Sequence, residues 1–115
     1  MVERLTQWHA RPGLAREEAV RYWTEEHARL VERVSYLEGY VQHVALVGRD
    51  GSEPPYAGLG EARFASFEDA ARATETAEWV AVIEDARTFM DFDRLVVAWA
   101  EGRVVVPETG EVSPA

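Results

Sequence analysis

The 115-residue sequence contains no cysteine and no lysine. Without cysteine it offers no disulfide bond, no thiolate ligand for a metal and no cysteine nucleophile. Without lysine it lacks the side-chain amine that Schiff-base and pyridoxal chemistry requires. Asparagine is also absent, so there is no N-glycosylation sequon. None of the four serines lies in a Gly-x-Ser-x-Gly motif either, so the three histidines, the carboxylates and the aromatic side chains remain as candidate functional groups.

Positive charge is scarce as well. Twelve arginines face 21 acidic residues, which gives a net charge of −9 and a pI near 4.8. Such a chain has no electrostatic footprint for nucleic acid and is repelled by anionic membranes. No hydrophobic run approaches the roughly 20 residues that span a bilayer. We therefore expect a single-domain cytoplasmic protein that binds neither nucleic acid nor a membrane.

The first half of the chain predicts a strand, a helix and a second strand. Residues 2–9 alternate in polarity and end at a Pro-Gly turn, which is typical of a strand. From Arg16 the period changes to three and four, which indicates an amphipathic helix without a side-chain cap at Ala15. Its apolar stripe contains Ala19, Val20, Trp23, His27, Leu30, Val31 and Val34. Residues 39–47 are rich in β-formers and predict the next strand.

The second half repeats this order. After a loop over residues 48–56, a strand is expected over 58–65, followed by a helix that opens at Ser66 with a capping sequence. Thr74 and Thr76 are expected to bend or break that helix. A final strand is expected over residues 92–106, and a polar tail over 107–115.

This order, βαββαβ, predicts an α+β fold of the ferredoxin-like type, with an antiparallel sheet and two helices on one face. The domain is expected to cover residues 1–106. The run from Leu95 to Ala100 is apolar in both strand phases, which is typical of a strand buried on both faces. Because the helices cover only one face, the sequence predicts a homodimer with the two sheets face to face.

His27 is the main candidate for chemistry. It lies four residues after Trp23 and four before Val31, so it points from the apolar stripe toward the sheet. It can be a core histidine satisfied by hydrogen bonds, or a general acid/base, since its pKa lies near working pH. His43 falls in the opposite strand phase from Tyr40 and is expected to face the partner chain. The histidines do not have metal-ligand spacing, so no metal site is expected.

Four more residues are predicted to contact a substrate: Trp8, Trp23, Gln42 and Asp85. Gln42 shares a strand face with Tyr40, and both lie opposite His27 if that face looks at the helices. The tryptophans also suit the hydrophobic core. Asp85 flanks the apolar side of the second helix, where it can be a buried hydrogen-bond anchor or a surface charge.

The segment from Glu18 to Val31 (EAVRYWTEEHARLV) resembles the EthD-domain pattern, in which a Tyr-Trp helix runs into a histidine. The resemblance continues at residues 39–43, 61–70 and 84–91. It implies a dimeric α+β barrel with a site between helices and sheet that uses neither metal nor organic cofactor. It also assigns acid/base chemistry to His27, and matches Tyr40 to a tyrosine used by some isomerases of this fold. Ala19 departs from the larger aromatic residue that is common there, and Arg29 replaces a proline.

Two functions follow as hypotheses. The first is a cofactor-independent lyase or isomerase, of dehydratase or cyclase type, for a small apolar carbonyl, aromatic, lactone or polyketide-like compound. His27 would move a proton, Tyr40 would donate to the developing enolate oxygen and Gln42 would orient the substrate. The alternative is a non-catalytic small-molecule or heme-binding accessory protein of a catabolic or biosynthetic pathway, with His27 or His43 as the axial ligand of a heme.

Overall fold

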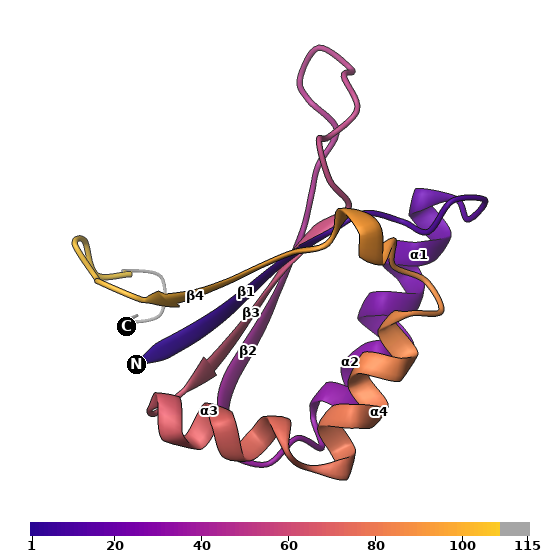
Figure 1. Cartoon of the computed structure of the whole chain (residues 1–115). Coiled ribbons are helices and arrows are strands. Elements are labelled where there is room, and N and C mark those ends of the chain that lie inside the picture. The colour runs from indigo at the N-terminus through magenta and orange to yellow at the C-terminus, as the bar shows by residue number, and fades with distance from the viewer. Residues whose placement is uncertain (109–115) are drawn as a thin grey trace.

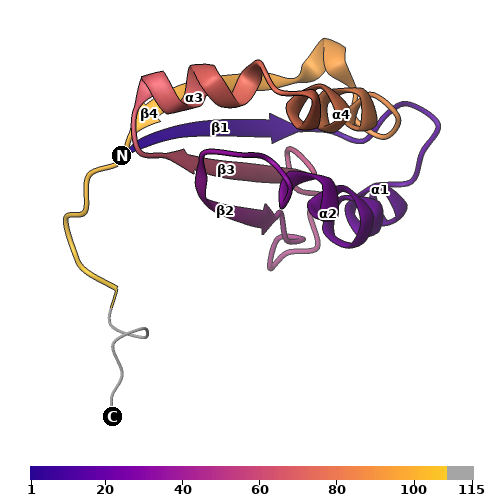
Figure 2. The ribbon, with the colours of Figure 1, turned by 90° about the horizontal axis from the view of Figure 1, so that it is seen from below.

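The computed structural model describes residues 1–108 and contains a four-stranded antiparallel sheet with its helices on one face (Figure 1). The strands are β1 (Val2–Trp8), β2 (Leu37–Val44), β3 (Gly58–Phe64) and β4 (Val96–Glu101). They lie in the order β2-β3-β1-β4, as Figure 2 shows. The predicted ferredoxin-like α+β fold is therefore confirmed.

The first helical segment runs without interruption from α1 (Arg16–Tyr22) through the π-helical turn η1 (Trp23–His27) into α2 (Ala28–Val31). The sequence predicted a regular helix, and the π turn is a difference. Its buried residues Ala19, Trp23, His27 and Val31 are spaced by four, which is wider than the 3.6 residues of an α-helical turn. One wider turn keeps this row facing the sheet.

The second helical segment is divided, as the two threonines predicted. Its parts are α3 (Phe67–Thr74) and α4 (Ala77–Ala86). Ser66 caps α3 by accepting a hydrogen bond from the Asp69 N–H at 3.1 Å. Thr76 caps α4 by accepting one from the Trp79 N–H at 3.2 Å. The break turns α4 toward α2 and toward the end of β1, where the candidate site lies.

The prediction of a long last strand over residues 92–106 is wrong at both ends. Phe92–Arg94 forms a 3-10 turn, η2, and β4 ends at Glu101. β4 ends at Glu101 because this residue pairs with Val2, the first residue of the neighbouring strand β1. Pro107 and Glu108 are exposed and form neither helix nor strand, and residues 109–115 of the predicted tail lie outside the described residues.

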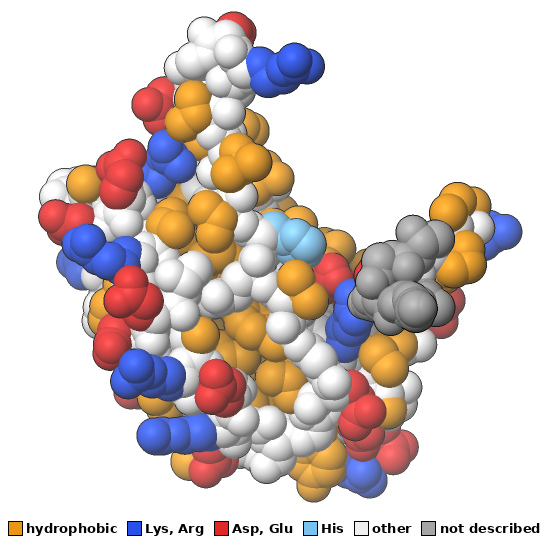
Figure 3. Space-filling model, turned by 180° about the vertical axis from the view of Figure 1, so that it is seen from behind, with side chains coloured by type: hydrophobic (Ala, Val, Ile, Leu, Met, Phe, Trp, Pro, Cys, Tyr) orange, Lys and Arg blue, Asp and Glu red, His pale blue; other side chains and the backbone are white. Residues whose placement is uncertain are grey.

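In the single chain both faces of β4 are exposed to solvent. One copy of the chain therefore does not bury the two faces of this strand as predicted. Val96 is 53% exposed and Trp99 is 42% exposed. The face away from the helices also carries Leu5, Val41 and Leu59, beside a cluster of Glu3, Glu61 and Arg63. Figure 3 shows exposed hydrophobic side chains on the projecting β2–β3 hairpin and below it, and Leu46 of this hairpin is 81% exposed.

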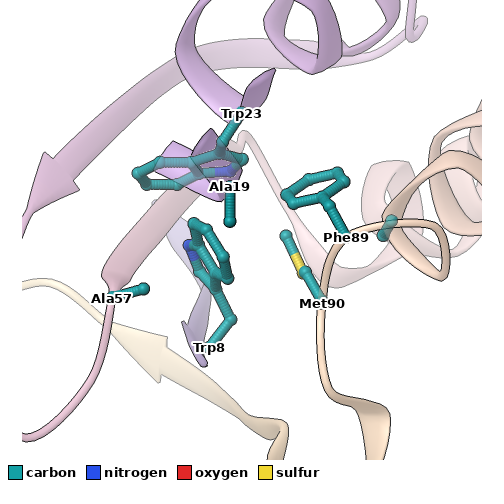
Figure 4. Packing of buried hydrophobic residues seen from close by; sticks show 7 residues of the cluster. Trp8, Ala19, Trp23, Ala57, Phe89 and Met90 are labelled. Carbon is teal, nitrogen blue, oxygen red and sulfur yellow. The ribbon is translucent and has the colours of Figure 1, made fainter. Parts of the chain in front are cut away.

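The core between sheet and helices contains two hydrophobic clusters. In the first, the Trp8 and Trp23 rings meet edge-on at 5.2 Å, with Phe89 and Met90 beside them (Figure 4). The second contains Val31, Val34, Ala62, Phe64, Ala70, Ala73 and Val82. Among residues 1–108, no helix has the length and apolar character needed to cross a membrane.

Candidate functional site

A cavity of about 60 Å³ lies between the sheet and the helices. Its walls are largely apolar, and most polar groups enter from the sheet. The residues that line it include Arg4, Thr6 and Trp8 of β1, Tyr40 of β2, Gly60 and Ala62 of β3, Trp23 and His27 of η1, Val31 of α2, and Trp79, Val82 and Ile83 of α4. A small organic molecule is the kind of ligand that such a space suits.

His27 is held by a chain of three hydrogen-bonded side chains. Its Nδ1 lies 2.8 Å from Asp85 Oδ2, and the Tyr22 hydroxyl donates to Asp85 Oδ1 at 2.5 Å. An ionised carboxylate only accepts hydrogen bonds, so the proton of the first bond belongs to Nδ1. That tautomer leaves a lone pair on Nε2, for which no hydrogen-bond partner is found among residues 1–108.

Burial controls the charge of this histidine. His27 is 3% exposed, and burial lowers its pKa despite the opposing effect of the hydrogen bond to Asp85. The imidazole is therefore neutral at pH 7 and can accept a proton at Nε2. The hydrogen bond to Asp85 raises the pKa of the Tyr22 hydroxyl, so Tyr22 remains a donor at neutral pH. Together these effects leave a neutral imidazole and a protonated Tyr22 hydroxyl on either side of the Asp85 side chain.

Tyr40 contributes a hydroxyl on the sheet side of the cavity. This group lies over Gly60, where an added Cβ would be only 3.3 Å from the Tyr40 oxygen. Burial raises the pKa of Tyr40, so the hydroxyl stays protonated and can donate to an oxygen that becomes negative. The face of β2 that carries Tyr40 points toward the helices. This is the orientation in which the strand phase places Tyr40 opposite His27.

The structure brings four of the six predicted site residues to the cavity: Trp8, Trp23, His27 and Tyr40. Gln42 does not line the cavity. Its side-chain amide donates a hydrogen bond to the Trp23 carbonyl at 3.0 Å, at the start of the π turn. Asp85 lies behind His27 and accepts a hydrogen bond from it. Of the two predicted roles, a buried hydrogen-bond anchor or a surface charge, the structure matches the first. His43 is on the opposite face of the sheet, 3.6 Å from Glu61.

Two residues of the site were missed from the sequence, Tyr22 and Arg4. Tyr22 lies at the edge of the helical stripe, and only the position of Asp85, 63 residues later, gives it a partner. Arg4 had a detectable signal. It shares its strand phase with Val2, Thr6 and Trp8, so the alternation places one charged side chain on the face that turns toward the core.

The site is a poor fit for heme. His27 Nε2 has no hydrogen-bond partner among residues 1–108, but a cavity of about 60 Å³ is far too small to hold a heme. His43 is outside it, with a half-exposed side chain. Within the described part of the chain, no group of three or more His, Asp or Glu side chains could hold a metal ion.

Comparison with known proteins agrees with this architecture. The model of the EthD domain matches residues 11–93. The chain belongs to the EthD family. Another EthD-family protein, from Bacillus halodurans, is 20% identical with a TM-score of 0.72, over 90% of this chain and 100% of that one.

More distant structures share the fold. A dimeric ferredoxin-like protein of unknown function from Bacteroides fragilis is 13% identical (TM-score 0.65, 88% of this chain and 95% of that one). SnoaB, a cofactor-independent oxygenase from Streptomyces nogalater, is 14% identical (TM-score 0.65, 93% and 97%). No curated protein matches this EthD-family chain.

Proposed function

We propose that this EthD-family protein is a cofactor-independent lyase or isomerase that moves a proton next to a carbonyl group of a small, largely apolar substrate. The observation that carries the proposal is the Tyr22–Asp85–His27 hydrogen-bond chain, which ends at an imidazole in the wall of a mostly apolar cavity. A neutral histidine oriented by a carboxylate is a suitable general base.

The proposed reaction begins when His27 Nε2 removes a proton from the carbon beside the carbonyl. The electron pair of the C–H bond forms the carbon–carbon double bond of the enolate, the π pair of the carbonyl moves onto its oxygen, and that oxygen accepts a hydrogen bond from the Tyr40 hydroxyl. The imidazolium that forms is stabilised by Asp85, which accepts from its Nδ1–H. His27 then returns the proton to a different carbon in an isomerase. In a lyase the carbonyl re-forms, the bond from the β-carbon to the leaving group breaks, and His27 gives its proton to the departing group.

The surroundings favour this chemistry over simple binding. The walls around His27 are apolar, and a hydrogen bond to a developing negative charge is stronger there than in water. SnoaB is described as a cofactor-independent oxygenase, which supports reactions without a resident cofactor on this fold.

We also propose that the protein works as a homodimer, paired through the sheet face that the helices leave open. Val41 and Val96 on that face are 36% and 53% exposed in the single chain. The similar protein from Bacteroides fragilis is described as dimeric. Covering these side chains would shield the sheet that forms the floor of the cavity.

Deuterium exchange tests the proposed chemistry. A panel of small carbonyl compounds, both neutral ketones and lactones and charged keto acids, is incubated with the protein in D₂O, and loss of the α-proton signal is followed by NMR. His27→Gln should lower the exchange rate by about 10²–10⁴, the usual effect of one positioned acid/base group, and Tyr40→Phe should lower it less. His43→Gln, a histidine outside the cavity, is the control. Exchange by His27→Gln at the rate of His43→Gln would overturn the proposal and leave a binding protein.

A further inference from the structure

Arg4 is unusual among the residues of the cavity. Among residues 1–108, it is the only side chain in the cavity wall that carries a permanent charge. It lies in the middle of the sheet, because β1 is a central strand and Arg4 pairs there with Ala62 and Trp99. A guanidinium at this position needs a reason, since arginine is rarely turned toward an apolar interior without a partner.

No carboxylate of the described residues forms an ion pair with Arg4. Its guanidinium donates to the Thr6 hydroxyl at 2.9 Å and lies 5.0 Å from the centre of the Trp79 ring. Acidic residues are in large excess, 21 against 12 arginines, and Arg16, Arg63 and Arg72 all lie beside carboxylates. Of the three arginines that are not exposed, Arg4, Arg16 and Arg63, only Arg4 has no carboxylate beside it within the described residues.

This arrangement costs stability in the free protein. Burial lowers the pKa of Arg4, which means that the surroundings disfavour its charged form. Thr6 and Trp79 compensate only in part, since a hydroxyl and a ring face are weaker partners for a guanidinium than an anion is. An anion brought into the cavity would form the charge-assisted hydrogen bonds that the protein itself does not supply.

We propose that Arg4 is the binding site for the carboxylate of the substrate, so that the cavity takes small carboxylic acids rather than neutral compounds. This inference rests on the proposed function and names the class of its substrate. Arginine suits the task because its planar guanidinium can bind a carboxylate through two parallel hydrogen bonds.

The position of Arg4 also orients the ligand. Arg4 stacks on Trp79, which packs against the cluster of Val31 and Val82, whereas His27 contacts Phe89 of the other cluster. Arg4 thus lies beside the second cluster and His27 beside the first. A carboxylate held at Arg4 directs the apolar body of the acid, and the carbon that loses the proton, toward His27.

NMR with an isosteric pair of probes tests this inference. Propionate and propionamide have nearly the same shape and differ in charge. Each is titrated at constant ionic strength while the indole N–H signals are recorded. Trp8, Trp23 and Trp79 line the cavity, so their signals report binding there. Propionate should shift these signals and bind at least tenfold more tightly than propionamide.

Variants at Arg4 complete the test. Arg4→Gln should lose the preference for propionate, Arg4→Lys should keep part of it, and Arg49→Gln, in the exposed hairpin, should keep all of it. Arg4→Gln should fold at least as stably as the wild type, because it removes a partly buried charge without an ion partner. If Arg4→Gln binds propionate as the wild type does, or if propionamide binds equally well, the inference is wrong. Loss of α-proton exchange in His27→Gln would still stand in that case, so the two failures are separable.

Discussion

Replacing Asp85 by asparagine should disable His27 without removing it. Asp85 accepts from Tyr22 at one oxygen and from His27 Nδ1–H at the other, and asparagine has only one oxygen. If that oxygen keeps the Tyr22 hydroxyl as its donor, the amide NH₂ faces Nδ1. The imidazole then carries its proton on Nε2, and the lone pair that should act as the base is lost from the cavity side.

The size of the effect follows from the two hydrogen bonds. In the wild type the bond from Nδ1–H to a carboxylate favours the reactive tautomer by about 1.5–3 kcal/mol. In Asp85→Asn a neutral bond favours the other tautomer by about 0.5–1.5 kcal/mol, so only about a tenth to a third of the molecules keep a free Nε2. Loss of the carboxylate also lowers the pKa of His27 further, since Asp85 is the group that raises it. We expect exchange to fall by about tenfold or more.

A second substitution gives a rescue. In Asp85→Asn combined with Tyr22→Phe, the amide no longer has a hydroxyl to satisfy and can turn its oxygen to Nδ1–H. The double variant should therefore exchange faster than Asp85→Asn alone. Nitrogen-15 NMR of the imidazole should report the protonated Nε2 in the single variant and the protonated Nδ1 in the double. A double variant as slow as the single one, or a single variant with unchanged exchange and tautomer, would refute the reasoning.

Two further predictions concern stability and assembly. Because burial lowers the pKa of His27 below its unfolded value near 6.5, the unfolded state takes up the proton first as the pH falls. Urea denaturation should thus show stability falling below pH about 6.5, and a flatter profile in His27→Gln. Val96→Glu, on the open face of the sheet, should convert a dimer to a monomer in light scattering, whereas Val80→Glu, equally exposed on α4, should not; a dimer in both variants would contradict the proposed interface.

Local patterns predicted most of the fold. The alternation of β1, the capping residue Ser66, the helix break at Thr74 and Thr76, and the apolar stripe of the first helix each act over a few residues. The end of β4 was missed, because it is set by where β1 begins on the neighbouring strand rather than by any residue near Glu101. The π turn was missed for a different reason, since the four-residue spacing that indicates it was taken as an ordinary helical stripe.

The site was less predictable, because its decisive contacts join distant parts of the chain. The spacing of His27 placed it in the core but left its partner unknown, and Asp85 gave two readings that only the 2.8 Å contact separates. Gln42 was on the expected strand face, yet its amide is used by the Trp23 carbonyl. Arg4 could have been found from the strand phase of its neighbours.

The pH dependence of α-proton exchange, recorded beside the NMR titration of His27, tests most directly whether this imidazole is the base. The exchange rate should fall as the pH drops, with an inflection below 6.5 that coincides with the titration of His27, because only the neutral imidazole accepts the proton. A flat profile, or an inflection at a pH where His27 does not titrate, would contradict the assignment.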